Sequence, residues 1–241
     1  MTSRFEELDF QQTPLGELSL RRRQSPSIPD EPVYEVKIGN ELLMSSTVNA
    51  SERALARLAL EGRADQTCDV LVGGLGLGYT AATALEYSSV RSLVVIELLT
   101  AVIDWHRRRL VPMADRLMDD LRCSLVEGDF FDHVAPGISA HRERLYDIIL
   151  LDIDHSAESW LHARHREFYT DIGFRGLFDR LRPGGVFGFW SASEPADQLL
   201  DIVKGIFPSV QCHEISFTNP HLGVTDANWV LIARSAPALA G

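Results

Sequence analysis

The sequence predicts an α/β fold, a doubly wound and mostly parallel seven-stranded sheet preceded by a small antiparallel β module. Short apolar runs alternate with segments of helical periodicity from about residue 49 onward. Several of these runs are too apolar to face solvent on either side, which is typical of strands in a parallel sheet. A glycine-rich loop follows the first of them, as in strand–loop–helix units that bind nucleotides.

Residues 1–48 differ in pattern from the rest of the chain. Residues 17–21 and 33–38 alternate polar and apolar side chains, as half-buried strands do. Gly39 and Asn40 form a two-residue turn signal, so residues 41–44 are predicted to return as the partner strand. We therefore predict an N-terminal β module over residues 1–48 and a nucleotide-binding domain over residues 49–241.

The stretch Cys68–Thr80, CDVLVGGLGLGYT, organises the predicted domain. Its apolar run predicts a buried central strand, and Gly74, Gly76 and Gly78 follow before a predicted helix. Glycine lets the backbone turn sharply and lets a ligand approach without a Cβ in the way. The loop is therefore a candidate binding site, and a tight turn with no ligand is the alternative.

The next predicted strand, residues 93–96, ends at Glu97. An acidic residue at this place meets the ribose hydroxyls in nucleotide-binding βαβ units. A dinucleotide fingerprint would need glycine where Tyr79 stands, and the G-x-G-x-G pattern found instead is that of enzymes that bind S-adenosylmethionine. The sequence thus predicts an adenosine-bearing ligand held by the three glycines and Glu97.

The remaining elements follow in alternation. Helical periodicity predicts helices over residues 51–60, 79–87, 99–110, 168–181 and 196–207. Apolar runs predict further strands over residues 124–126, 147–151, 186–190, 211–217 and 229–233. The sequence Pro183-Gly184-Gly185 predicts a turn before the fifth strand of the domain.

Polar side chains stand at the predicted carboxyl ends of the strands, where ligands bind in such sheets. Asp129 follows the third strand of the domain, and Asp152, Asp154 and His155 follow the fourth. Their shared placement with Glu97 is stronger evidence for a site than any one of them.

Composition limits the function classes. A net charge of −11 argues against nucleic acid as the main partner and suits a cationic small molecule such as an amine. No apolar run approaches the length of a membrane span, and the N-terminus lacks a signal-peptide core, so we expect a cytoplasmic protein. His155, His162 and His165 lack the partners of a metal motif, so no metal is predicted.

With these motifs in view, the chain resembles the spermidine/spermine synthase family, the polyamine aminopropyltransferases. The resemblance rests on VLVGGLGLGYT, LVVIEL, Gly128-Asp129, YDIILLDID, FYTDIGFRGLFDRLRPGGVFGFW and NWVLIAR. It implies a Rossmann domain of the S-adenosylmethionine-dependent methyltransferase type behind a small β domain, and a homodimer. It further implies that Glu97 holds the ribose hydroxyls and that Asp129 contacts the adenine.

The implied reaction assigns roles to the residues after the fourth strand. An amine must lose a proton before it attacks a sulfonium donor, and a nearby carboxylate can take that proton. Asp152 is the candidate catalytic residue, with Asp154 as a second anchor and His155 as a proton relay. A structural aspartate after the strand and a hydrogen-bonded loop histidine are the alternatives.

This sequence departs from the family pattern at three places. Leu77 stands where the family usually has an aspartate near the donor's amine tail, and Asp152-Ile153-Asp154-His155 replaces Asp-Ser-Ser-Asp. Ala50-Ser51 replaces a Tyr-Gln pair, if Glu52 is the family's first-helix glutamate.

The sequence therefore favours no single one of three functions. The first is transfer of an aminopropyl-type group from decarboxylated or intact S-adenosylmethionine to an amine, as in polyamine biosynthesis. The second is S-adenosylmethionine-dependent methyl transfer to a small molecule. The third is nucleoside binding without catalysis.

Overall fold

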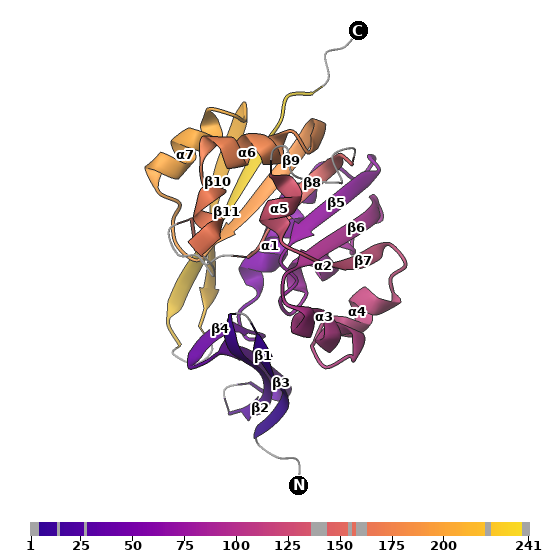
Figure 1. The fold of residues 1–241 in the computed structure, drawn as a ribbon, viewed down its shortest axis with the longest axis vertical. Helices are drawn as coiled ribbons and strands as arrows, with labels where there is room; N and C mark the ends of the chain where they lie inside the picture. The colour runs from indigo at the N-terminus through magenta and orange to yellow at the C-terminus, as the bar shows by residue number, and fades with distance from the viewer. Residues whose placement is uncertain are drawn as a thin grey trace.

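The computed structural model contains two β-sheets, one small and antiparallel, the other large and mostly parallel (Figure 1). It describes residues 5–13, 15–26, 28–135, 144–153, 156–157, 163–219 and 223–237. The smaller sheet comes first in the chain and lies, in Figure 1, next to α3 (Thr100–Arg107) and the hairpin of β10 (Ser209–Thr218) and β11 (Thr225–Arg234). This arrangement matches the predicted fold class.

The N-terminal sheet has four antiparallel strands in the order β1-β2-β3-β4. They are β1 (Phe5–Thr13), β2 (Gly16–Ser25), β3 (Ile28–Ile38) and β4 (Glu41–Ser45). The predicted hairpin at Gly39 is confirmed, since Ile38 pairs with Glu41 and Gly39 has φ +55°. Strand β1 was not predicted, because its sequence is acidic and only partly alternating. The domain boundary at residue 48 stays a prediction.

The larger sheet has seven strands in the order β10-β11-β9-β8-β5-β6-β7. Strands β5, β6, β7, β8 and β9 run parallel, whereas β11 and β10 are antiparallel to their neighbours. The strands are β5 (Cys68–Gly73), β6 (Val90–Glu97), β7 (Cys123–Glu127), β8 (Tyr146–Leu151), β9 (Leu181–Ser191), β10 (Ser209–Thr218) and β11 (Thr225–Arg234). The order reverses between β5 and β8, where a crevice for ligands forms in such sheets.

Helices cover both faces of the larger sheet. They are α1 (Ala50–Leu60), α2 (Tyr79–Ala84), α3 (Thr100–Arg107), α4 (Ala114–Asp119), α5 (Phe130–Val134), η1 (Ala163–Glu167), α6 (Asp171–Phe178) and α7 (Asp197–Lys204). Helices α4 and α5 were not predicted, since six- and five-residue helices leave little periodicity to detect. Helix α6 is shorter at both ends than the helix predicted over residues 168–181.

The predicted turn at Pro183-Gly184-Gly185 is wrong. These residues lie inside β9, near an irregularity in its pairing with β8. Gly184 has φ +74°, and its N–H donates to the carbonyl of Ala236. The glycine pair therefore bends a long strand instead of ending it, which is a common use of glycine at a bulge.

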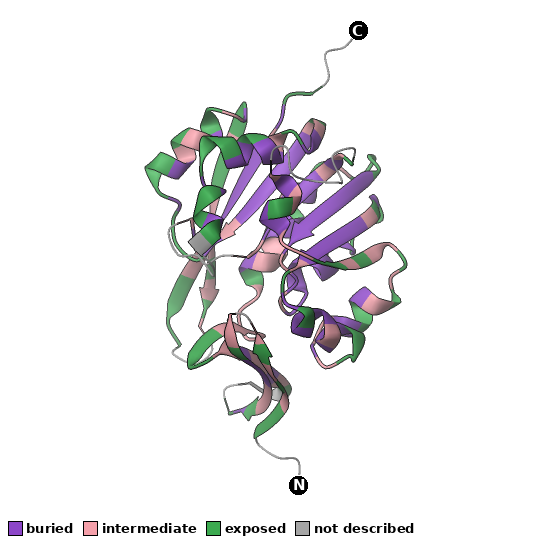
Figure 2. Ribbon diagram, viewed as in Figure 1, coloured by how far each residue is buried: buried purple, intermediate pink, exposed green. Residues whose placement is uncertain are grey.

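Alternate residues of the central strands point into two separate apolar layers. Val70 and Val72 belong to the layer with α1 to α4, whereas Leu71 belongs to the layer with α5 to α7. Ile148 and Ile149 divide in the same way. Figure 2 shows the central strands buried and much of the N-terminal sheet exposed or intermediate. Burial on both faces holds the strand ends, and hence the loops after them, in fixed positions.

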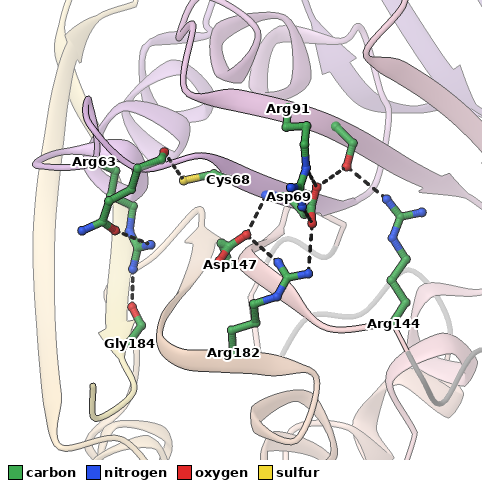
Figure 3. Close-up of polar contacts among 10 residues, drawn as sticks. Arg63, Cys68, Asp69, Arg91, Arg144, Asp147, Arg182 and Gly184 are labelled. Atoms are coloured by element: carbon green, nitrogen blue, oxygen red, sulfur yellow. Dashed lines mark hydrogen bonds and ion pairs between the residues drawn. The ribbon is translucent and has the colours of Figure 1, made fainter. Parts of the chain in front are cut away.

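An ion network joins the amino ends of four strands, on the side of the sheet away from the glycine loop (Figure 3). The Asp69 carboxylate accepts from Arg91 and from Ser92 Oγ at 2.7 Å, and Arg182 Nη2 lies 3.0 Å from it. Arg182 also bridges to Asp147 at 2.6 Å. The hydrogen bond from Arg91 is the largest cause that holds the pKa of Asp69 well below its usual range.

A polar contact joins the N-terminal sheet to helix α3. The indole N–H of Trp105 on α3, itself fully buried, donates to Asp9 Oδ2 on β1 at 2.7 Å. Arg108, at the end of α3, lies 3.5 Å from the same carboxylate. This contact helps to place the N-terminal sheet beside the glycine loop. There the sulfur of Met44 on β4 would lie 3.4 Å from a Cβ atom added to Gly76.

We predict that Asp69→Asn lowers the free energy of unfolding by about 1–3 kcal/mol at pH 7, because two arginines lose a charged acceptor. A carboxyl whose folded pKa is depressed stabilises the fold above its unfolded pKa of 3.8 and loses this effect as pH falls. The difference between wild type and variant should therefore narrow below about pH 4. Urea denaturation at pH 7 and pH 3 measures it, with exposed Asp65→Asn as the control. An equal difference at both pH values would contradict the prediction.

Candidate functional site

The glycine loop connects β5 to α2 through backbone shapes that favour glycine. Gly74 and Gly78 have φ +91°, and Gly76 has φ +50°. A Cβ on Gly74 would overlap the carbonyl oxygen of Asp152, so the loop packs directly against the end of β8. His106 Nε2 lies 3.0 Å from the carbonyl oxygen of Gly76. Burial lowers the pKa of His106 to about 4, so the neutral ring donates this bond near neutrality.

Glu97 ends β6, as predicted, and its carboxylate faces the glycine loop. Oε2 accepts from the backbone N–H of Leu75 at 2.9 Å, and Oε1 accepts from that of Leu99 at 2.9 Å. Burial raises the pKa of Glu97, and the backbone donors oppose that shift. The carboxylate therefore holds the loops that follow two adjacent strands.

Asp129 lies immediately before α5 and caps it. Its Oδ1 accepts from the backbone N–H of Phe131 at 2.8 Å, and Gly128 N–H donates to the carbonyl of Glu97 at 3.0 Å. A cavity of about 80 Å³ is lined by Gly74, Gly76, Glu97, Asp129 and Asp152, together with apolar side chains from β4 and α5. The structure thus brings together four of the five predicted nucleoside residues around one cavity.

Asp152 follows β8 directly and is held by backbone and side chain. Its N–H donates to the carbonyl of Gly73 at 2.8 Å, and its Oδ2 accepts from Thr80 Oγ1 at 2.6 Å. Burial raises the pKa of the carboxyl, opposed by the Thr80 hydrogen bond. Asp152 lines the 80 Å³ cavity and also a second, larger one, so it stands where the two cavities meet.

Glu52 on α1 is a second carboxyl group beside Asp152. Desolvation is the largest cause that raises its pKa toward neutrality, and the negative charge of Asp152 adds to it. Thr80 links the two, since its hydroxyl lies 2.6 Å from Asp152 Oδ2 and 3.3 Å from the backbone oxygen of Glu52. Because the charge of Asp152 opposes ionisation of Glu52, the two groups resist ionising together, so near neutrality the pair can hold and exchange a proton.

From the sequence, Glu52 is only a match to the family's first-helix glutamate, with no role predicted for it. On the chain it lies 100 residues before Asp152, on a helix with no ligand motif of its own. The one sequence feature that points to Glu52 is its position next to Ala50-Ser51, which replaces the family's Tyr-Gln pair. Tertiary packing of α1 against β8 and β9 is what makes it part of the site.

The larger cavity has a volume of about 400 Å³ and combines apolar walls with carboxylates. Of the described residues that line it, none is a lysine, arginine or histidine. Its acidic residues are Glu35, Glu52, Asp152 and Asp226. Glu35 is paired with Arg23 at 2.7 Å, so the other three supply most of the negative charge. Such a cavity favours a cation with an apolar body.

Gly78, Leu77 and Trp190 line this larger cavity. Gly78 therefore lines the larger cavity, Gly74 lines the smaller one, and Gly76 lines both.

Asp154 and His155, the predicted anchor and proton relay, lie outside the described residues. Among the residues that the structure describes, no three side chains are grouped as metal ligands would be.

The model of the spermine/spermidine synthase domain family matches residues 50–218. The chain is 32% identical to the polyamine aminopropyltransferase of Pyrobaculum calidifontis over 155 residues, which cover 61% of this chain and 51% of that protein. It is 23% identical to the spermine synthase of Saccharomyces cerevisiae over 184 residues, which cover 73% and 59%. The chain spans about half the length of the curated relatives that head these matches.

Solved structures share the fold. The spermidine synthase of Thermotoga maritima has a TM-score of 0.71 at 18% identity and covers 95% of this chain and 73% of its own. A spermidine synthase in complex with the transition-state analogue AdoDATO has a TM-score of 0.72 at 17% identity and covers 95% and 74%. Human methyltransferase-like protein 13, in complex with SAH, has a TM-score of 0.54 at 17% identity and covers 80% and 82%.

In the described part of the chain, no helix is both long and apolar enough to cross a membrane.

The family match covers the helix with Glu52, the glycine loop, Glu97, Asp129 and Asp152. Since this match covers well over half of the sequence, the chain belongs to the spermine/spermidine synthase domain family.

Proposed function

We propose that this protein transfers an alkyl group of the aminopropyl type from an S-adenosylmethionine-type donor to an amine. The observation that carries the proposal is the carboxyl pair of Asp152, which lines both cavities, and Glu52, which lines the larger one. One cavity offers nucleoside contacts, and the other is acidic. The donor's reacting carbon would therefore lie beside a group that can accept a proton.

The chemistry follows from the charges. The acceptor arrives as an ammonium, attracted by the carboxylates, and must lose a proton before its nitrogen can attack. The nitrogen then forms a bond to the donor's carbon as the carbon–sulfur bond breaks, and the sulfonium becomes a neutral thioether. The proton goes to the Glu52–Asp152 pair, whose raised pKa values suit this exchange near neutrality.

Methyl transfer from intact S-adenosylmethionine is the second candidate. Leu77, in the larger cavity wall, supplies no charge to neutralise a donor ammonium and none to repel a donor carboxylate. The two reactions release different nucleosides. Aminopropyl transfer leaves methylthioadenosine, whereas methyl transfer leaves S-adenosylhomocysteine. Incubation of the protein with each donor and a panel of amines, followed by chromatography, tests both, and release of neither nucleoside would favour a non-catalytic protein.

Two finer expectations, a homodimer and a cytoplasmic location, also remain proposals. The N-terminal sheet carries exposed aromatic residues on β1, Phe5 and Phe10, each about half exposed. Such side chains are compatible with burial against a second chain. Light scattering during size-exclusion chromatography measures the mass directly.

The first prediction for the site concerns nucleoside binding by Gly74–Gly78, Glu97 and Asp129. Glu97→Ala should weaken binding of methylthioadenosine by about 1.5–3 kcal/mol, typical of hydrogen bonds to a charged group. Calorimetry measures the dissociation constant. Glu127→Ala is the matched control, since Glu127 pairs with Glu97 in the sheet but is exposed and lines neither cavity. Equal affinity of both variants would contradict the assignment.

The second prediction separates chemistry from binding. Asp152→Asn retains the shape and removes the base, so turnover should fall about 10²–10⁴-fold while the dissociation constant of the nucleoside changes little. Steady-state rates with the acceptor found above, together with calorimetry, measure both quantities. Wild-type turnover in the Asn variant would show that Asp152 is not catalytic.

The third prediction concerns the donor tail. Wild-type protein should bind intact and decarboxylated S-adenosylmethionine within about tenfold of each other, because Leu77 distinguishes neither tail by charge. Leu77→Asp should bind the decarboxylated donor more tightly than the intact donor. Leu77→Asn should not, because asparagine has the size of aspartate but no charge. Dissociation constants of both donors test this. A hundredfold weaker binding of the intact donor by wild type would mean that another acidic group acts in place of Leu77.

A further inference from the structure

Ser51 lies behind the wall of the larger cavity and joins three of its lining residues. It is fully buried, precedes Glu52 on α1 and is not itself part of the lining. Its Oγ lies 2.8 Å from Trp190 Nε1 on β9, 2.9 Å from Asn228 Nδ2 on β11, and 2.9 Å from Glu52 Oε2. One hydroxyl therefore connects a helix and two strands at the site.

The direction of these three hydrogen bonds follows from the chemistry of the groups. An indole N–H and an amide NH₂ only donate, so Trp190 and Asn228 occupy the two lone pairs of the Ser51 oxygen. The hydroxyl proton is left for the remaining neighbour, the carboxylate of Glu52. Both N–H donors polarise the hydroxyl and strengthen the bond that it donates.

We propose that Ser51 is a positioning residue that fixes the carboxylate of Glu52 toward Asp152 and favours its ionised form. A hydrogen bond donated to a carboxylate stabilises the charged state and opposes desolvation. Without it, Glu52 would keep its proton to higher pH and the pair would lose a proton acceptor. The catalytic part of this inference rests on the proposed transferase function, whereas the effect of Ser51 on Glu52 does not.

A backbone hydrogen bond at Glu52 also favours its ionised form, and Ser51 is the side chain that donates a hydrogen bond to this carboxylate. Asp152, after β8, has the same charge and opposes ionisation of Glu52. Arg53, the next residue on α1, favours ionisation, but its guanidinium lies 5.0 Å from the ring centre of Tyr79. The further titratable groups that line the same cavity as Glu52 are Tyr79 on α2, Glu35 on β3 and Asp226 on β11. Strand β9 presents the neutral Trp190.

The test compares Ser51→Ala with Ser191→Ala. Ser191 follows Trp190 on β9 and is 1% exposed, and its Oγ has no hydrogen-bond partner among the described residues. Both variants delete one buried hydroxyl, but only Ser51→Ala removes a donor to Glu52. Ser51→Thr, which keeps the hydroxyl, serves as the rescue. Carboxyl ¹³C labelling of glutamate followed by NMR titration measures the pKa, with Glu52→Gln used to assign the signal.

The titration midpoint of Glu52 should rise by about one pH unit in Ser51→Ala and stay unchanged in Ser191→Ala. Ser51→Thr should titrate as wild type does. With a turned-over acceptor, kcat of Ser51→Ala at pH 7 should fall about tenfold and recover at higher pH, with the donor's KM unchanged.

The two proposals can fail separately. An unchanged Glu52 midpoint in Ser51→Ala, or an equal shift in Ser191→Ala, would overturn the positioning role whatever the activity. A shifted midpoint in a protein that releases neither methylthioadenosine nor S-adenosylhomocysteine would sustain the role of Ser51 and overturn the transferase function instead.

Discussion

The site depends on the close approach of two neighbouring strand ends. Gly74 leaves β5 directly against the carbonyl of Asp152, and Asp152 N–H donates to Gly73 at 2.8 Å. Any side chain at Gly74 would force the strands apart, and its φ of +91° already disfavours one. This backbone contact sets the positions of the glycine loop and of the Asp152 carboxylate at once, so in the proposed reaction the donor and the base would lie together.

Carboxyl groups at the two ends of the sheet have opposite pKa shifts. At the amino ends of the strands, Asp69 and Asp147 are paired with arginines, which keeps the carboxylate of Asp69 ionised. At the carboxyl ends, Glu52 and Asp152 receive hydroxyl hydrogen bonds, and burial raises their pKa values. The first arrangement stabilises the fold, and the second keeps protons exchangeable near neutrality. Perturbed carboxyl groups in a cavity are the usual sign of a functional site.

Most of the fold was predictable because its signals are local. The apolar runs of β5 and β8 predict buried parallel strands. The alternation of polar and apolar residues, with the turn signal at Gly39, predicts the β3–β4 hairpin. The misses have physical causes. Helices α4 and α5 are too short to show a period, and the glycine pair in β9 looks like a turn in sequence but forms a bend in a long strand. Local turn signals do not report what the neighbouring strand does.

The sequence by itself determined the α/β class, the glycine loop and the carboxylates at the strand ends, because the ends of parallel strands meet at one edge of a sheet. Only the tertiary structure decided that Asp152 influences the ionisation of Glu52, and that Ser51 reaches Trp190 and Asn228, 139 and 177 residues away. These contacts depend on how α1 packs over β8, β9 and β11. Such packing results from the fit of many distant side chains, and no periodicity or spacing along the chain encodes it.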